Sequence, residues 1–296
     1  MNTKSVINYR NYQRLGYQRL LQGVYAPSTT AEGDPWQLRR LNWQTRVKAV
    51  LKHYADKQPV LYGATALQAL GVALPQAAQD WDVIHIMIAE GIERPRRAGV
   101  VAHRGRPGRS VWRTVNGMPV LHPVDHWLQI RGVTDDELTE IGDGFVRRKN
   151  PLLTIYQMQH RLSELSHEPG VVPVRRAMRL VLPDTDSIYE TKTRLLMIRS
   201  GLPTPTVNYP VWCPRSDFTY LIDMGYPDQK IGIEYDGAYH GQSREQMSMD
   251  ADRRRNLLDA GWFMITVTAD QLNHPTDFLD SIRRALVLGN PVITMR

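Results

Sequence analysis

Three acidic residues and a histidine lie within one short, strand-like part of the chain, and their spacing suits the binding of a cation. Asp223 falls in an alternating apolar run, and Glu234 and Asp236 fall in the next run, ahead of His240. A Pro-Asp turn signal separates the runs, so we predict a β-hairpin in which Asp223 faces Glu234, with Cβ atoms about 5 Å apart. Two carboxylates this close repel each other unless a proton or a cation lies between them. The residues therefore predict a Mg²⁺ (or Mn²⁺) site suited to phosphodiester hydrolysis.

Helices and strands on both sides of the hairpin are predicted to position these groups. A helix over 187–200 has Glu190 in its first turn, although a capping box from Ser187 to Glu190 would explain that acid equally well. An extended segment over 203–213 leads into the hairpin. A helix over 244–260, a strand over 262–268 and a helix over 276–288 follow it. Arg253 on the first of these helices is predicted to contact a phosphate or a carboxylate, the alternative being an ordinary surface salt bridge.

Five motifs of this C-terminal part carry a resemblance to a known family. They are SIYE (187–190), RSGLPTP (199–205), LIDMGYPDQKIGIEYDGAYH (221–240), DADRR (250–254) and GWFMITVT (261–268). In this order they resemble the Vsr-like (very-short-patch-repair-like) branch of the PD-(D/E)XK endonucleases. The resemblance implies a restriction-endonuclease-like core over residues 183–296. It also implies DNA cleavage with Mg²⁺, and Glu190 as a metal ligand beside Asp223 and Glu234.

The chain departs from the commonest form of this motif, which has a lysine where Asp236 stands. The Vsr-like branch commonly has an aspartate there. His240 is then a candidate general base, because its ordinary pKa of about 6.5 suits that role, and Lys230 is the alternative as a relocated cation. Asp236 is either a second metal ligand or the residue that sets a turn at Gly237. The predicted catalytic set is therefore Glu190, Asp223, Glu234, Asp236 and His240, unless these acids are the remains of an inactive nuclease fold.

Positive charge is concentrated far from these acids. The net charge is +7, and residues 1–60 alone carry +7, residues 91–118 carry +6 and residues 180–296 carry −3. The segment RPRRAGVVAHRGRPGRSVWR (94–113) is rich in arginine, whose planar fork matches phosphate. We predict that arginines of this segment, together with Arg253 on the helix over 244–260, bind nucleic acid; the alternative is a solvated basic surface. The predicted binding residues are Arg96, Arg97, Arg104, Arg106, Arg109 and Arg253.

The N-terminal part shows a second family resemblance. Two short helices over 8–22 broken at Gly16, a strand over 23–27 and a helix over 36–57 suggest a winged helix. The motifs GVYAPS (23–28), YGATALQALGV (62–72), the arginine-rich strand and NGMPVLHPVDHWLQI (116–130) resemble the AbiEi-like antitoxin family. This resemblance implies a transcriptional regulator with an N-terminal winged helix.

The whole chain is expected to be an α/β (α+β) protein of several parts. The predicted parts are a basic winged-helix-like segment (1–59), a small α+β domain (60–130), a helical connector (131–182) and the nuclease domain (183–296). In the connector, Asn150 is predicted to cap a helix over 151–165, and a further helix is predicted over 173–182.

Composition restricts the possible environments and partners of the protein. Cys213 is the only cysteine in 296 residues, which excludes an internal disulfide. No run approaches the roughly 18 apolar residues of a membrane span, and a signal peptide is lacking, so we expect a cytoplasmic protein without membrane partners. The expected partner is DNA, with RNA less favoured. The alternative to an endonuclease is a non-catalytic DNA-binding regulator of the antitoxin type.

Overall fold

The computed structural model describes residues 13, 17–21, 24–27, 35–105, 111–237 and 244–289. The chain divides into two compact units, which are described separately below. Unit 1 contains residues 1–134 and 159–175, and unit 2 contains residues 135–158 and 176–296. The segment predicted as a connector, 131–182, is thus shared between the two units rather than standing apart from them.

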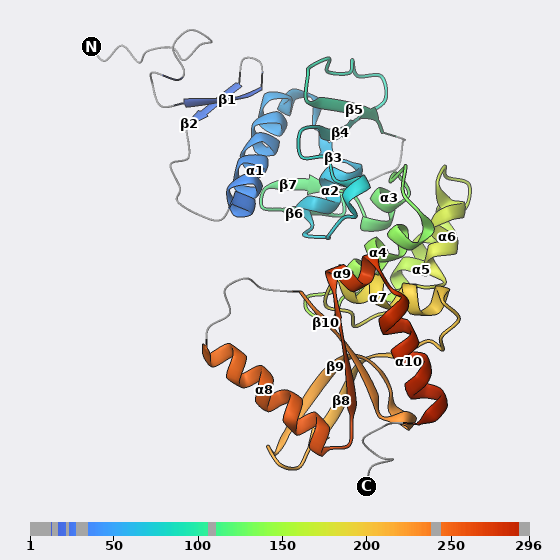
Figure 1. Ribbon diagram of the computed structural model, residues 1–296. Helices are drawn as coiled ribbons and strands as arrows, with labels where there is room; N and C mark the ends of the chain where they lie inside the picture. Colours follow the sequence, from blue (N-terminus) through green and yellow to red (C-terminus); the bar gives the residue numbers. More distant parts are fainter. Residues whose placement is uncertain are drawn as a thin grey trace. The chain divides into compact units, whose positions relative to one another are not determined.

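Unit 1 combines a two-stranded and a five-stranded sheet with the long helix α1 and several shorter helices (Figure 1). The five-stranded sheet has the order β5-β4-β3-β7-β6, so β5 is an edge strand. The elements of unit 1 are β1 (Tyr17–Leu21), β2 (Val24–Pro27), α1 (Pro35–His53), η1 (Ala55–Lys57), β3 (Val60–Leu61), α2 (Gly63–Ala69), η2 (Gln76–Ala78), β4 (Ile84–Ile88), β5 (Val100–Arg104), β6 (Arg113–Val115), β7 (Met118–Val120), α3 (Pro123–Trp127), the end of α5 (Ile155–Glu164) and most of α6 (Val171–Met178).

One N-terminal expectation is wrong. The second of the two helices predicted over 8–22 is the strand β1, which pairs antiparallel with β2 from Tyr17 opposite Pro27 to Leu21 opposite Val24. Two residues, including Gly23, separate these strands, and a connection this short with a glycine is typical of a hairpin. Local pairing therefore overrides the helical propensity of YQRLL. The strand at 24–27 and the helix α1 agree with the prediction, whereas 1–12 and 28–34 lie outside the described residues.

Unit 2 is built on a four-stranded sheet with the order β11-β10-β9-β8. The pair β10–β11 is parallel and the other pairs are antiparallel, so the sheet is mixed. The elements of this unit are α4 (Asp135–Phe145), the start of α5, the end of α6, α7 (Ile188–Arg199), β8 (Thr206–Cys213), β9 (Phe218–Tyr226), η3 (Pro227–Gln229), β10 (Ile231–Asp236), α8 (Arg244–Asp259), β11 (Phe263–Thr268), α9 (Ala269–Asn273) and α10 (Thr276–Leu288).

The predicted hairpin of unit 2 is confirmed with the expected register. Ile231 pairs with Tyr226 and Ile233 with Met224, across the short turn η3. Lys230 ends the turn in the left-handed conformation, at φ 51°. The alternation of apolar residues and the length of the turn had fixed which residues face each other.

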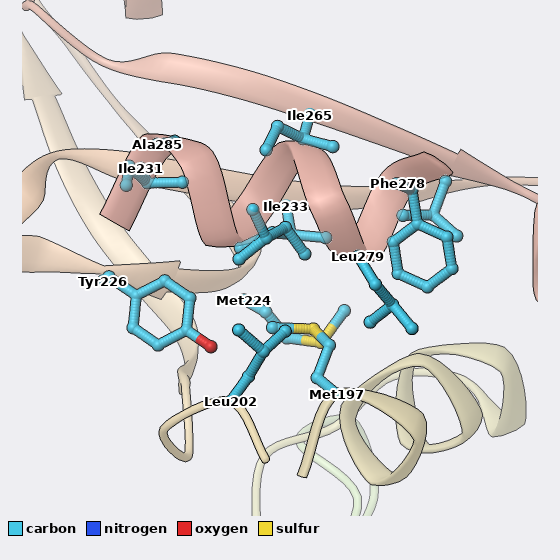
Figure 2. Close-up of a cluster of buried hydrophobic side chains, with 12 residues drawn as sticks. Met197, Leu202, Met224, Tyr226, Ile231, Ile233, Ile265, Phe278, Leu279 and Ala285 are labelled. Carbon is cyan, nitrogen blue, oxygen red and sulfur yellow. The ribbon is translucent and has the colours of Figure 1, made fainter. Parts of the chain in front are cut away.

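Two apolar clusters cover the two faces of this sheet. On one face, residues of α7 and α10 such as Met197, Phe278 and Ile282 pack against Ile231 and Ile233 of β10 (Figure 2). On the other face, Leu257 of α8 packs against Val211, Cys213, Ile222 and Trp262. The sheet is therefore a central layer between α7 with α10 on one side and α8 on the other, and burial of both faces stabilises it.

The helix α5 begins later than the sequence predicted. Asn150 does not cap it but has φ 54°, and the helix starts at Ile155. The Thr154 hydroxyl accepts a hydrogen bond from the amide of Gln157 at 3.2 Å, and the Gln157 side chain accepts one from the amide of Thr154 at 2.8 Å. This reciprocal capping box fixes the helix start, and the sequence T-x-x-Q at 154–157 is the signal that shows it.

A buried ion pair joins α4 to α7. Asp143 and Arg194 are each 1% exposed at the side chain, and their charged atoms are 2.7 Å apart. The Asp143 carboxylate also accepts hydrogen bonds from the hydroxyl of Thr191 at 2.8 Å and from the amide of Leu182 at 2.9 Å. Because every one of these partners is needed to balance a charge removed from water, the network holds α7 in one position against α4.

Glu140 of α4 makes the stability of the protein depend on pH. It is 6% exposed, and burial raises the pKa of its carboxyl to about 7, although the charge of Lys192 lowers it. The unfolded chain therefore loses this proton at lower pH than the folded protein, so the contribution of Glu140 to stability falls as the pH rises from 4.5 towards 7.

We expect Glu140→Gln, which cannot ionise, to be more stable than the natural protein at about pH 8 by on the order of 3 kcal/mol. The difference should disappear below about pH 4.5. Urea denaturation followed by circular dichroism at several pH values measures it. An equal effect at acidic and alkaline pH would show that the substitution acts through packing rather than through ionisation.

Candidate functional site

Asp223 and Glu234 lie side by side on adjacent strands. Continuing the register of β9 and β10 by one pair beyond Met224 and Ile233 places Asp223 opposite Glu234. Asp223 also accepts a hydrogen bond from the amide of Tyr235 at 2.9 Å. The register of the hairpin is therefore the one that the sequence predicted, and the charge of Asp223 adds to the effect of burial in raising the pKa of Glu234.

The strand β9 bends at Asp223. Ile222 belongs to the cluster under α8, whereas Met224 belongs to the cluster under α7 and α10, although residues two apart in a regular strand share a face. On β8, the register places Asn208 across from Asp223, and Asn208 has the left-handed φ of 46°. Asp223 therefore lies where the side chains of β9 stop alternating regularly between the two clusters.

Glu190 approaches the same place from the first turn of α7. Its amide donates to the hydroxyl of Ser187 at 3.1 Å, and its carboxylate accepts from the amide of Asp186 at 2.9 Å. Capping therefore accounts for part of the role of Glu190. Capping does not account for all of its surroundings. Burial and the nearby charge of Asp223 both raise the pKa of Glu190, so the two acids lie near each other.

The pKa values of all three carboxyls are raised. Burial is the largest cause in each case, and it raises the pKa of Glu190 and of Glu234 to about 7 and raises that of Asp223. Repulsion by Asp223 adds to the shift of both glutamates. The positive charge around these carboxyls therefore does not offset the effect of their burial, which is the environment expected where a cation is to bind.

Arg253 of α8 supplies one positive charge to this group. Its guanidinium lies 2.5 Å from a carboxylate oxygen of Glu234 and donates to the main-chain carbonyl of Leu221 at 2.6 Å. It lowers the pKa of both Glu234 and Asp223. The sequence had left open whether Arg253 contacts a phosphate or a carboxylate; in this structure it contacts a carboxylate.

The donor set and the side-chain positions give different indications about a metal ion. Asp223, Glu234 and Glu190 offer the oxygen ligands that Mg²⁺ prefers, and their raised pKa values fit a missing positive charge. Within the described ranges, however, no group of three or more His, Cys, Asp or Glu side chains is arranged to hold a metal. The guanidinium of Arg253 lies against Glu234, so metal binding would require this side chain to move.

The remaining predicted residues of this region lie at different places. Asp236 is exposed at the end of β10, where its charge raises the pKa of the Tyr235 hydroxyl. Lys230 donates to the main-chain carbonyl of Ala260 at 3.1 Å, which does not support its role as a relocated cation beside Glu234. His240 lies outside the described residues, so its role as a general base stays a prediction.

Sequence reasoning missed Asp186 and Arg148. The charge of Asp186 raises the pKa of both Glu190 and Asp223, so it belongs to the same acidic group. Arg148 forms an ion pair with Asp186. The position of Asp186 directly before the helix cap Ser187 was a usable signal, because acids collect at helix N-termini, whereas nothing in the sequence pairs it with Arg148.

A pair of tyrosines beside the acids was also missed. The rings of Tyr189 and Tyr235 are parallel, with an interplanar angle of 1° and centroids 4.7 Å apart. Tyr189 is 43% exposed, and the ammonium of Lys192 lies 5.5 Å from its ring centroid. Tyr189 precedes Glu190 and Tyr235 follows Glu234 in the sequence, so the stack joins the first turn of α7 to β10.

The predicted nucleic-acid-binding arginines of unit 1 are partly described. Arg96 and Arg104 are exposed, Arg104 at the end of the edge strand β5. Arg97 is partly buried and its main chain forms a bridge with Val100. Arg106 and Arg109 lie outside the described residues. The described part of the segment therefore places two of the predicted arginines in solvent along one sheet edge.

A substitution at Arg253 tests whether its guanidinium occupies the place of a divalent metal ion. We expect Arg253→Gln to lower the melting temperature by a few degrees in EDTA, because the partly buried Glu234 loses its counter-charge. Mn²⁺ should then raise the melting temperature more in the variant than in the natural protein, since no guanidinium competes with it for the carboxylates. Differential scanning fluorimetry measures both effects.

Arg255→Gln is the matched control, because Arg255 lies on the same helix and its side chain is 59% exposed. An equal response of all three proteins to Mn²⁺ would contradict the idea that Arg253 and a divalent cation compete for one place.

Fold and site together define a mixed α/β protein with two units and an acidic group at the centre of the second. None of the helices that the structure describes combines the length and the apolar character needed to cross a bilayer. The chain matches no protein-family model.

Comparisons with known proteins find distant relatives. "Uncharacterized protein MT2308" of Mycobacterium tuberculosis (strain CDC 1551 / Oshkosh) and "Uncharacterized protein Rv2248" of M. tuberculosis (strain ATCC 25618 / H37Rv) are each 24% identical to it over 116 residues. The match spans 39% of this chain and 42% of each relative. The crystal structure of the RV2827C protein from M. tuberculosis is similar with a TM-score of 0.35 and 14% identity, over 71% of this chain and 78% of that one.

Proposed function

We propose that unit 2 is a Mg²⁺-dependent endodeoxyribonuclease with a PD-(D/E)XK-like core of the Vsr-like branch, acting in defence or repair. The observation that carries the proposal is the juxtaposition of Asp223 and Glu234 across β9 and β10, with Glu190 electrostatically coupled to them. The order of α7, the strands β8 to β10, α8 and β11 agrees with the family that the sequence motifs resemble.

In this proposal the three carboxylates hold the metal ion and the neighbouring groups bind the substrate. When bound, Mg²⁺ polarises a phosphate and lowers the pKa of a water molecule. Arg253 leaves Glu234 and its planar fork pairs with a phosphate oxygen, which the 33% exposure of its side chain supports because a ligand can reach it. His240 is the general base that accepts a proton from the attacking water.

DNA is the proposed partner because two segments of the chain carry an excess of positive charge. Residues 1–60 and 91–118 carry the excess cations of the chain, and phosphate backbones bind such segments without sequence preference. The exposed Tyr189 ring offers a surface on which a base can stack. Single-stranded RNA is the less favoured substrate.

A second candidate function is a non-catalytic DNA-binding regulator of the antitoxin type. The ion pair between Arg253 and Glu234 favours it, because an internal cation then neutralises an acid that a nuclease needs for its metal. The resemblance of residues 1–130 to AbiEi-like regulators points the same way.

Incubation of the purified protein with supercoiled plasmid, with Mg²⁺ or with EDTA, separates the two candidates. Nicking that requires Mg²⁺ supports the nuclease. Slower migration of a promoter fragment in a gel, without any cleavage, supports the regulator. The nicking assay repeated on single-stranded RNA tests whether RNA is the substrate.

A further inference from the structure

A cleft in unit 1 adjoins the arginine-rich segment. It has a volume of about 240 Å³, and the residues that matter for its chemistry are Tyr62, Arg94, His103, Arg104, Gln129 and Glu168. A second hollow of about 380 Å³ shares Arg94 and Arg104, and its other charged residues are Arg96 and Glu93. The pair Arg94 and Arg104 therefore stands where two hollows meet, so one ligand can touch both arginines and extend to either side.

One wall of the cleft consists of packed rings. The centroids of Tyr62 and His103 are 4.6 Å apart, and those of His103 and His85 are 5.3 Å apart. His85 Nδ1 lies 3.0 Å from His103 Nε2. Burial lowers the pKa of both histidines, that of His103 to about 4, so both rings are neutral at neutral pH. The wall therefore presents aromatic rings, whose polar groups are the Tyr62 hydroxyl and the ring nitrogens.

The cations of the cleft are positioned by the main chain. Arg104 ends the edge strand β5 and pairs in register with Ile88 of β4, and the amide of Gly105 donates to the Ile88 carbonyl at 2.6 Å. Arg94 lies close enough to His103 for its charge to lower the pKa of that imidazole. Against these two cations the cleft has the single carboxylate of Glu168. The field inside the cleft is therefore positive.

We infer that this cleft binds a phosphate monoester, with Arg94 and Arg104 on the phosphate oxygens and the Tyr62–His103 wall against the attached sugar. Two guanidinium forks match the oxygens of a phosphate. The volume is below the roughly 300 Å³ at which pockets for drug-sized ligands begin, which suits a phosphate with its sugar better than a whole nucleotide. The second hollow gives the remainder of the ligand a path outward.

Two sources can present this group: the 5′-terminal phosphate of a nucleic-acid strand, or a small phosphorylated molecule such as a nucleoside monophosphate. The choice of a strand end rests on the proposed function, whereas the phosphate chemistry does not. Binding measured in EDTA involves no cleavage, so its outcome is independent of whether unit 2 is a nuclease.

The test is the affinity of the full-length protein, in EDTA, for a single strand labelled at its 3′ end. We expect the strand with a 5′-phosphate to bind at least about tenfold more tightly than the same strand with a 5′-hydroxyl, as measured by fluorescence anisotropy. The double variant Arg94→Ala/Arg104→Ala should lose this preference. The exposed Arg179, which is outside the cleft, provides the matched control Arg179→Ala, which should keep it.

Competition with AMP distinguishes the sources. If the strand shows no 5′-phosphate preference but AMP binds the natural protein and not the double variant in calorimetry, the ligand is the small molecule and the inference holds. If neither the phosphorylated strand nor AMP depends on Arg94 and Arg104, the inference is wrong. Circular dichroism of the double variant, together with the charge-conserving variant Arg94→Lys/Arg104→Lys, separates loss of binding from loss of fold.

Discussion

Asp223→Asn is expected to reduce Mg²⁺-dependent nicking of plasmid DNA by more than about 100-fold, because loss of even an outer-shell partner of a metal ligand typically costs 10–100-fold. The substitution keeps the volume of the side chain and can still accept a hydrogen bond from the amide of Tyr235, so the bend of β9 should persist. The measurement is the initial rate of conversion of supercoiled to open-circular plasmid at saturating Mg²⁺.

Asp228→Asn is the matched control, since Asp228 is exposed in the turn between the same two strands. It removes one negative charge from the same hairpin and should leave the rate unchanged. Equal loss in both variants would indicate a general effect of charge, and full activity of Asp223→Asn would exclude the proposed nuclease site.

Asp143→Asn is expected to destabilise unit 2 by about 3–5 kcal/mol, because it leaves the guanidinium of Arg194 buried without a counter-charge. Both side chains are 1% exposed, so solvent does not screen the loss. Urea denaturation followed by circular dichroism gives the free energy of unfolding. Since α7 carries both Arg194 and Glu190, nicking activity should fall at temperatures where the natural protein is still fully active.

Asp135→Asn is the comparison, because Asp135 pairs with Arg176 on the surface, at 34% and 54% side-chain exposure. Its effect on stability should be much smaller, as exposed pairs contribute little. If the two substitutions had equal effects, the buried pair would not be what holds α7 in place.

Local patterns in the sequence were sufficient for the hairpin and for most helices of unit 2. Alternation on two runs and a short turn determine which residues face each other, so Asp223 and Glu234 could be paired without coordinates. The start of α7 was equally readable from the cap at Ser187. These features depend on residues a few positions apart, which is why single-sequence reasoning reaches them.

Contacts between distant residues could not be predicted in this way. The pairs Arg253–Glu234 and Arg148–Asp186 join different elements, and many arginines were equally eligible for each acid. The irregularity at Asp223, and the left-handed Asn208 that the register places beside it, are likewise absent from any local sequence pattern. The electrostatics of the candidate site follow from these long-range pairs, so its residues were predictable while its charge balance was not.

The two helices beside the carboxylates are held very differently. The buried ion pair anchors α7, whereas the described side chains of α8 before Asn256 are exposed or partly exposed, Met249 at 62%, and only near its far end are Asn256 and Leu257 buried. Amide hydrogens of α7 should therefore exchange with deuterium only through large-scale unfolding, and those near the start of α8 through local opening of low free energy. In the proposed nuclease, a bound DNA strand would therefore be accommodated by movement of α8, while α7 keeps its position.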